Sequence, residues 1–275
     1  MQHNKPIRGA IFDIDGTLAM MDKTKGTYTA LAGAVEALET LRAAKIPVIA
    51  YTNGTFFPIA DYYPLLADAG LVLDPDHIIT PAAVAVHHLK EQGYHRVMVF
   101  GAEGTKLPMQ EAGFDVVDAV PGQDPVEAVL MGWTRDFGVP NLEAVCEAIW
   151  AGAVPFTGSD APFFAGASGK ILGVSGAVAA MVTKVTGQTP TVLGKPSTLG
   201  LDMSASILGC GVDEVAVIGD DPLLEIMMAR KAGSLAIGVT TGIADQAAFN
   251  AVEPDLRAHL VISSLSQLPL EYWKA

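Results

Sequence analysis

The sequence has few of the features that mark nucleic-acid-binding, membrane-spanning or disulfide-bonded proteins. Its 17 Lys and Arg face 30 Asp and Glu, a formal net charge of -13, so nucleic acid and anionic membranes are not expected partners. Its two cysteines, Cys146 and Cys210, form neither a disulfide framework nor a Cys-x-x-Cys zinc pair. None of the six histidines has the His-x-x-x-His spacing that places two metal ligands on one helical face.

Long apolar runs are also missing. Half of the residues are hydrophobic, yet no uninterrupted stretch approaches the roughly 18 to 20 residues that a bilayer span requires. The first residues, MQHNKP, lack the apolar centre of a secretion signal and lead almost directly into a predicted strand. We therefore expect a soluble, cytoplasmic protein with reduced thiols and a large buried core.

Short apolar runs alternate with Ala- and Leu-rich segments along nearly the whole chain, a pattern typical of parallel βαβ units. The apolar spacing predicts a helix at 33–44. Strands are predicted at 7–12, 46–51, 190–194, 214–218, 234–239 and 259–262. The sequence thus predicts an α/β fold with a doubly wound parallel sheet.

The middle of the chain contains enough elements to form a core of its own. Its strands are predicted at 96–100, 128–132 and 153–157, and its helices at 140–151 and 175–186. Thr80-Pro81 and Thr189-Pro190 favour breaks close to its two ends, because proline disfavours helix in the residue before it. We predict a catalytic core formed by 1–80 plus 185–275, and an inserted α/β cap domain at 81–184.

Two carboxylates, Asp13 and Asp15, follow the first apolar strand and precede a glycine turn at Gly16. Carboxylates gathered at the end of a buried strand repel one another and lose hydration, which is tolerable mainly beside a cation. The pattern favours a metal-assisted reaction.

Three further motifs follow predicted strands, and ligands bind at the carboxyl ends of strands in open α/β sheets. Residues 51–55 (YTNGT) offer a hydroxyl, an amide and a glycine backbone for phosphate oxygens. Residues 193–196 (LGKP) place one lysine at a strand end, and residues 217–221 (VIGDD) add two more carboxylates. Each motif alone is a common turn or cap, but all four in this order indicate one active site.

With these four motifs the chain resembles the haloacid dehalogenase-like hydrolase superfamily over nearly its full length. Within it, the stretches 33–36, 79–82, 187–190 and 194–197 are similar to subfamily IIA, the branch of 4-nitrophenylphosphatase, ribonucleotide monophosphatase and pyridoxal phosphate phosphatase. About forty residues separate the first motif from the second, and about 140 separate the second from the third. The larger interval is where this branch carries its cap.

The resemblance implies a Mg²⁺-dependent phosphatase acting on a small phosphorylated metabolite. Asp13 would be the nucleophile that forms an aspartyl-phosphate, and Asp15 the general acid and base. The Asp13 carboxylate, the Asp15 carbonyl and Asp220 would bind the metal, while Asp221 would orient a water on it.

Four residues are implied in holding the phosphoryl oxygens, a task of positioning and electrostatics. They are Thr52, Asn53, Gly54 and Lys195. Two alternatives stay open: a phosphotransferase of the same fold, and a non-catalytic metabolite-binding member. A nucleotide-binding loop at Gly101-x-x-Gly104 lacks the rest of its motif.

The chain departs from the family pattern mainly in its specificity loops. After the second motif, residues 54–58 (GTFFP) lack the cation expected there, and the predicted cap loop 157–164 reads TGSDAPFF. Phe56, Asp160 and Phe163 are therefore candidate specificity residues. We hypothesise an apolar or aromatic leaving group rather than a second anion, while packing within each domain or at an oligomer contact equally explains the phenylalanines. In the helix after the fourth motif, Leu224-Glu225 replaces the usual Thr-Asp, which could alter magnesium affinity. Apolar cap helices also permit a homodimer through the cap.

Overall fold

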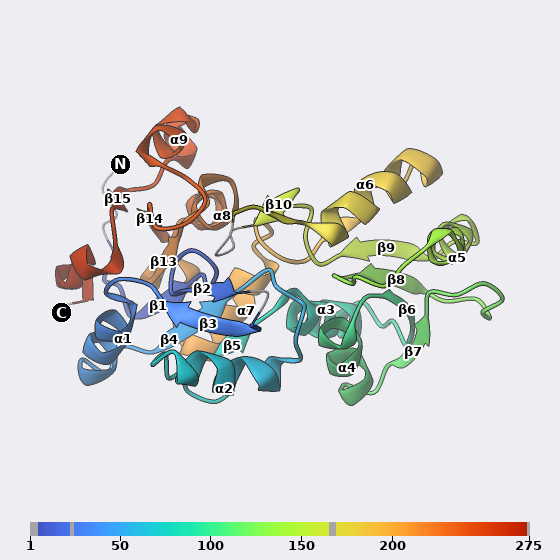
Figure 1. The fold of residues 1–275 in the computed structure, drawn as a ribbon, viewed down its shortest axis with the longest axis horizontal. Coiled ribbons are helices and arrows are strands. Elements are labelled where there is room, and N and C mark those ends of the chain that lie inside the picture. The colour runs from blue at the N-terminus through green and yellow to red at the C-terminus, as the bar shows by residue number, and fades with distance from the viewer. Residues whose placement is uncertain (1–4, 23–24, 165–168, 274–275) are drawn as a thin grey trace.

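The computed structural model describes residues 5–22, 25–164 and 169–273, which form two parallel sheets with helices on both faces (Figure 1). The first sheet has six strands in the order β15-β14-β13-β1-β4-β5, all parallel. Their bounds are β1 Gly9–Phe12, β4 Val48–Tyr51, β5 Ile78–Ile79, β13 Val215–Gly219, β14 Leu235–Val239 and β15 Leu260–Ile262. The α/β, doubly wound fold is confirmed, and so are the strands predicted at 7–12, 46–51, 214–218, 234–239 and 259–262.

Side chains of this sheet alternate between two apolar clusters, as the two-residue period of a strand requires. In β1, Ala10 and Phe12 pack on one face with helices α1 (Ala34–Ala43) and α2 (Ile59–Asp68). Ile11 packs on the other face with α7 (Leu199–Leu208), α8 (Met227–Ala232) and α9 (Gln246–Ala251). Because both faces are covered, the strands are apolar throughout.

The second sheet has five parallel strands in the order β12-β9-β8-β6-β7. They are β6 Arg96–Phe100, β7 Asp115–Asp118, β8 Ala128–Met131, β9 Val154–Thr157 and β12 Thr191–Val192. One face packs against α3 (Pro81–Glu91) and α4 (Glu103–Glu111), the other against α5 (Val139–Trp150) and α6 (Val174–Thr186). The α5 and α6 face has a cluster drawn entirely from residues 98–182, as expected for a segment with its own core.

One predicted strand belongs to the other sheet. Thr191 and Val192, within the strand predicted at 190–194, pair with Phe156 and Thr157 of β9 rather than with the first sheet. The domain limits at 80/81 and 184/185 stay predictions, and the first and second sheets also share one apolar cluster through α3 and α7.

Two antiparallel pairs complete the fold. A hairpin of β2 (Ala19–Asp22) and β3 (Thr27–Ala30) follows β1, and β10 (Phe163–Phe164) pairs with β11 (Ile171–Leu172). Short helical turns occupy Val212–Glu214, Pro222–Ile226, Pro254–Leu256, Leu265–Gln267 and Leu270–Trp273. Within the described ranges, no helix is long and apolar enough to cross a membrane. The cytoplasmic location stays a prediction.

Candidate active site

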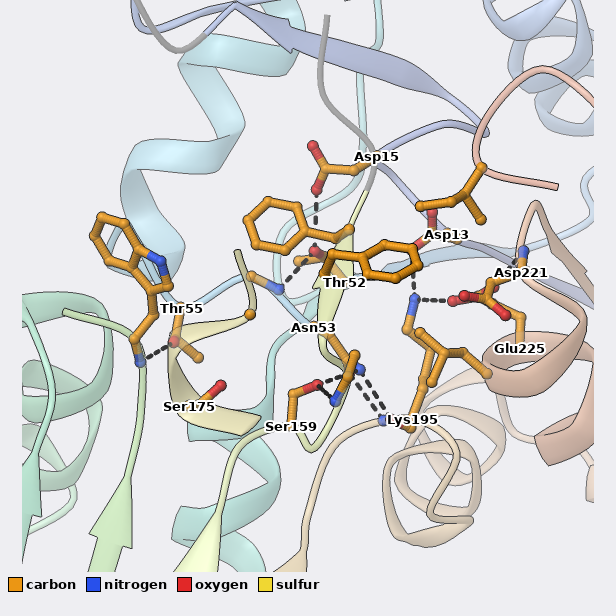
Figure 2. A pocket seen from close by; sticks show the side chains of 18 of the residues that line it. Asp13, Asp15, Thr52, Asn53, Thr55, Ser159, Ser175, Lys195, Asp221 and Glu225 are labelled. Atoms are coloured by element: carbon orange, nitrogen blue, oxygen red, sulfur yellow. Dashed lines mark hydrogen bonds and ion pairs between the residues drawn. The ribbon is translucent and has the colours of Figure 1, made fainter. Parts of the chain in front are cut away.

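The site lies where three neighbouring strands of the first sheet end. Asp13 follows β1, Thr52 follows β4 and Asp220 follows β13, and β1 lies between the other two strands. Because the strands are parallel, their carboxyl ends share one edge of the sheet. These residues line a cavity together with Lys195 and residues of the second sheet's loops (Figure 2).

Lys195 is the cationic centre of this cavity and is almost fully buried, with 1% of its surface exposed. Its Nζ is ion-paired with Asp13 and lies 2.6 Å from Oε1 of Glu225. It also donates a hydrogen bond to the Tyr51 carbonyl at 2.9 Å. The two carboxylates together raise the pKa of Lys195 against the effect of its burial, which keeps the ammonium charged.

Asn53 holds the backbone that carries Lys195. Its Oδ1 accepts the Lys195 backbone N–H at 2.8 Å, and its Nδ2 donates to the Lys195 carbonyl at 2.9 Å and to Ser159 Oγ at 3.3 Å (Figure 2). The side-chain amide, predicted to bind phosphate, is therefore used to join three segments far apart in sequence.

Thr52 connects the second motif to the first. Its buried hydroxyl lies 3.4 Å from Oδ2 of Asp15, to which it donates, and accepts the Gly54 backbone N–H at 2.9 Å. Desolvation raises the pKa of the Asp15 carboxyl to about 6, while Lys195 and Thr52 act against this rise. A carboxyl with such a pKa can both give and accept a proton near neutral pH.

Asp220 is enclosed by backbone. Its Oδ2 accepts the Ile243 N–H at 2.6 Å, and a Cβ on either Gly16 or Gly242 would collide with the same carboxylate. Gly16 also has φ of +103°, a conformation that side chains disfavour. The glycine after the first two carboxylates thus makes room for a third carboxylate about two hundred residues away.

The cavity contains more acidic side chains than basic ones. Five carboxylates line it against one described lysine: Asp13, Asp15, Asp220, Asp221 and Glu225. Burial raises the pKa of Asp13 to about 8, with Lys195 acting against it, and raises the pKa of Asp221. The pKa of Asp220 is raised by burial, then by the charges of Asp13 and Glu225.

This environment fits the predicted Mg²⁺. A divalent cation would remove the repulsion between Asp13 and Asp220, and oxygen is the donor that Mg²⁺ prefers. No three His, Cys, Asp or Glu side chains form a ready metal cage among the residues described. The predicted set needs only two carboxylates and the Asp15 carbonyl, which suits an ion that usually keeps several waters.

Glu225 is the functional candidate that sequence reasoning missed. The sequence suggested only that the Leu224-Glu225 replacement alters magnesium affinity, yet Glu225 is buried, pairs with Lys195 and accepts the Asp221 N–H at 3.1 Å. Its position in the first turn after Pro222, four residues beyond Asp221, was the available signal. Ser159, Ser175 and Trp133 also line the cavity without having been predicted.

Two of the three candidate specificity residues lie at the cavity and one does not. Phe56 and Phe163 line the cavity, whereas Asp160 is exposed and is absent from its lining, because the chain turns it toward solvent between Ser159 and Ala161. Phe56 meets Phe164, but Phe57 instead packs against Tyr62, with centroids 5.8 Å apart.

The Gly101-x-x-Gly104 motif has a packing role. A Cβ on Gly104 would collide with the carbonyl oxygens of Thr55 and Phe57, so this glycine lets α4 approach the loop after β4. The motif thus lets the loops of the two sheets pack together.

A doubly wound sheet with acidic motifs at its switch point and a second α/β unit over them defines a capped hydrolase. Residues 10–115 match the family described as haloacid dehalogenase-like hydrolase, and residues 192–268 match the HAD-hydrolase-like family. The chain belongs to the haloacid dehalogenase-like hydrolases and is a phosphomonoester hydrolase.

Several relatives are named as phosphatases. The chain is 27% identical over 93% of its length to the dihydroxyacetone phosphatase of Corynebacterium glutamicum (strain R), covering 88% of that protein. Its fold matches a 4-nitrophenylphosphatase from Thermotoga maritima with a TM-score of 0.84 at 23% identity, covering 95% and 96% of the two chains. It also matches a glycerol phosphate phosphatase from Mycobacterium tuberculosis, solved in complex with magnesium, with a TM-score of 0.83 at 24% identity, covering 94% and 75%.

Proposed function

We propose that this hydrolase is a Mg²⁺-dependent phosphatase that cleaves a small phosphomonoester through an aspartyl-phosphate on Asp13. The observation that carries the proposal is the buried Asp13 carboxylate beside Lys195 at the end of β1, in a cavity with Asp15 and Asp220. The relatives named for dihydroxyacetone and glycerol phosphate support a small substrate.

In the first step an Asp13 carboxylate oxygen forms a bond to phosphorus as the bond from phosphorus to the alcohol oxygen breaks. Asp15, whose carboxyl accepts a hydrogen bond from the Thr52 hydroxyl, gives its proton to the leaving alkoxide. Lys195 offsets the charge on the phosphoryl oxygens, and the nearby backbone of residues 52–54 positions them.

In the second step Asp15 takes a proton from water, whose oxygen bonds to phosphorus while the bond to Asp13 breaks. This releases inorganic phosphate and restores both carboxyl groups. Closure of the second α/β unit over the site would exclude bulk water from the first step.

Mg²⁺ would be held by the carboxylates of Asp13 and Asp220 and the Asp15 carbonyl. When bound, it supplies Lewis-acid stabilisation of the phosphoryl charge. Asp221, whose carboxyl lies at the same edge of the first sheet, would contact a water bound to the ion.

The test is hydrolysis of para-nitrophenyl phosphate with and without Mg²⁺, by the wild type, Asp13→Asn and the exposed control Asp202→Asn. We expect metal-dependent turnover that Asp13→Asn reduces at least about a thousandfold, since loss of a nucleophile removes the covalent route. Metal-independent turnover, or full activity in Asp13→Asn, would exclude the mechanism. Phosphate transfer to an added alcohol in preference to water would favour the phosphotransferase alternative, and binding without turnover the non-catalytic one.

A further inference from the structure

Four aromatic residues line the cavity, Phe56, Trp133, Phe163 and Phe164, and the rings of Phe56, Trp133 and Phe164 form one wall of it. The ring centroids of Phe56 and Trp133 lie 4.2 Å apart at 60°, and those of Phe56 and Phe164 lie 5.4 Å apart at 62°. Such inclined contacts are the favourable arrangement of aromatic pairs. All four side chains are only partly buried, so they retain apolar surface that a ligand could cover.

The aromatic wall is assembled from three separate segments and is fixed by hydrogen bonds. Phe56 lies in the loop after β4, Trp133 in the loop after β8, and Phe164 in β10. The Trp133 backbone N–H donates to Thr55 Oγ1 at 3.1 Å, which ties the first two segments together (Figure 2). The wall is therefore held at a set position relative to Lys195, whose backbone the neighbouring Asn53 holds.

The charge of the cavity is unfavourable to a second anionic group. Among the described lining residues Lys195 is the single cation, and it is already paired with Asp13 and Glu225. Two other cations contact aromatic rings without lining the cavity: Arg135 lies 5.5 Å from the centroid of the Trp133 ring and Lys170 lies 3.8 Å from that of the Phe163 ring. Their charge contributes to these cation–π contacts.

From this geometry we infer, on the basis of the function proposed above, that the substrate's alcohol carries a neutral aromatic ring that packs against Phe56, Trp133 and Phe164. The phosphoryl group would lie at Asp13 and Lys195, and the ring would cover the exposed apolar surface of the wall. The ring would thus determine substrate specificity through apolar contacts, and no further cation would be needed to bind the leaving group.

The experiment compares three esters of alkyl alcohols: benzyl phosphate, glycerol 3-phosphate and 2-phosphoglycolate. None is an aryl ester, so an activated phenol leaving group does not bias the comparison. We expect kcat/KM for benzyl phosphate to exceed that for glycerol 3-phosphate about tenfold or more, the effect of one good aromatic contact with its burial. Phosphoglycolate, with its second anion, should be the poorest of the three.

Two variants and a matched control test whether the aromatic wall causes the preference for benzyl phosphate. Phe56→Ala and Phe164→Ala should each lower kcat/KM for benzyl phosphate about tenfold, mainly through KM, and change glycerol 3-phosphate less than threefold. Phe137→Ala removes another partly exposed aromatic outside the cavity and should change neither. An equal loss on both esters would show that the wall only packs the two units together, and would overturn the inference.

The outcome separates the inference from the proposed function. If the wild type hydrolyses glycerol 3-phosphate or phosphoglycolate better than benzyl phosphate, with Mg²⁺ dependence and loss in Asp13→Asn, the ring specificity is wrong and the phosphatase mechanism stands. If no ester is turned over with Mg²⁺, the proposed function fails first.

Discussion

At the scale of single residues, the position and charge of Lys195 depend on partners that lie far away from it in the sequence. Asn53 holds its backbone from a loop 142 positions away, while Asp13 and Glu225 hold its charge. Asp13 follows β1 and Asn53 lies in the loop after β4, whereas Glu225 lies in the helical turn after β13. Removal of Asn53 or Glu225 should therefore disturb the phosphate site indirectly, through Lys195.

Replacing Asn53 by alanine tests the backbone contacts. Loss of the two hydrogen bonds to Lys195 should lower the free energy of unfolding by about 1 to 3 kcal/mol, since partly buried donors and acceptors lose their partners. It should also lower kcat about tenfold, because Lys195 is no longer held in place. Asn250→Ala, on the exposed side of α9, is the control, and urea unfolding with steady-state kinetics measures both effects. Equal behaviour of the two variants would contradict this role.

The pKa of Asp13 makes the metal-free protein sensitive to pH. Burial raises this pKa from 3.8 to about 8, so between these values the folded state binds more protons than the unfolded state. The free energy of unfolding should therefore fall as pH rises from 5 to 8, by at most about 1.4 kcal/mol per pH unit for one group. Thermal unfolding in chelator should show this decline, and Mg²⁺ should offset it.

Asp13→Asn should flatten the decline without abolishing it, because the pKa values of Asp15 and Asp220 are raised as well. Asp202→Asn should leave the slope unchanged. A wild-type slope in the Asp13→Asn protein would show that another group causes the pH dependence.

At the scale of elements, the loop after β14 completes the acidic site. Ile243 donates to Asp220, the Thr241 hydroxyl donates to the Gly16 carbonyl at 2.7 Å, and Gly242 lies against the Asp220 carboxylate. This loop joins the first and fourth motifs, although it belongs to neither.

Gly242→Ala should displace the Asp220 carboxylate, because the added Cβ has no space beside it. We expect a loss of about 1 to 3 kcal/mol in the free energy of unfolding, as for other overpacked sites, and a Mg²⁺ requirement raised about tenfold or more. Gly138→Ala, whose Cβ would meet only Pro140 at 3.6 Å, is the matched control. Metal titration of activity that gives the same midpoint in both variants would refute this view of the loop.

The elements that could be predicted from sequence are those with strong periodic patterns. The helix at 33–44 and the strand at 96–100 were predicted because apolar spacing and length suffice there. The partner of β12 could not be predicted, since two strand residues carry no signal that chooses between two sheets. Glu225 and the loop at Gly242 were missed because their roles come from long-range contacts with Lys195 and Asp220.

At the scale of the whole molecule, helices α5 and α6 of the second α/β unit carry exposed apolar side chains. Trp150 of α5 and Val185 of α6 are 61% and 58% exposed, and Met181 lies on the same helix as Val185. These side chains agree with the sequence-based proposal of a homodimer through this unit.

We expect light scattering to give twice the chain mass for the wild type and the monomer mass for Val185→Glu, since a buried carboxylate would be costly. Val72→Glu introduces the same charge at an exposed residue of the other unit and should leave the dimer intact. A monomeric wild type would contradict the dimer.

The central claim is that Asp13 carries the phosphoryl group during turnover. Acid quenching of the Mg²⁺-loaded enzyme within one turnover of para-nitrophenyl phosphate, followed by borohydride reduction, converts an aspartyl-phosphate to homoserine. Peptide mass spectrometry should find this change at residue 13 alone and should find none in Asp13→Asn. Homoserine at Asp15 or Asp220 instead, or unmodified Asp13 under conditions of active turnover, would contradict the account.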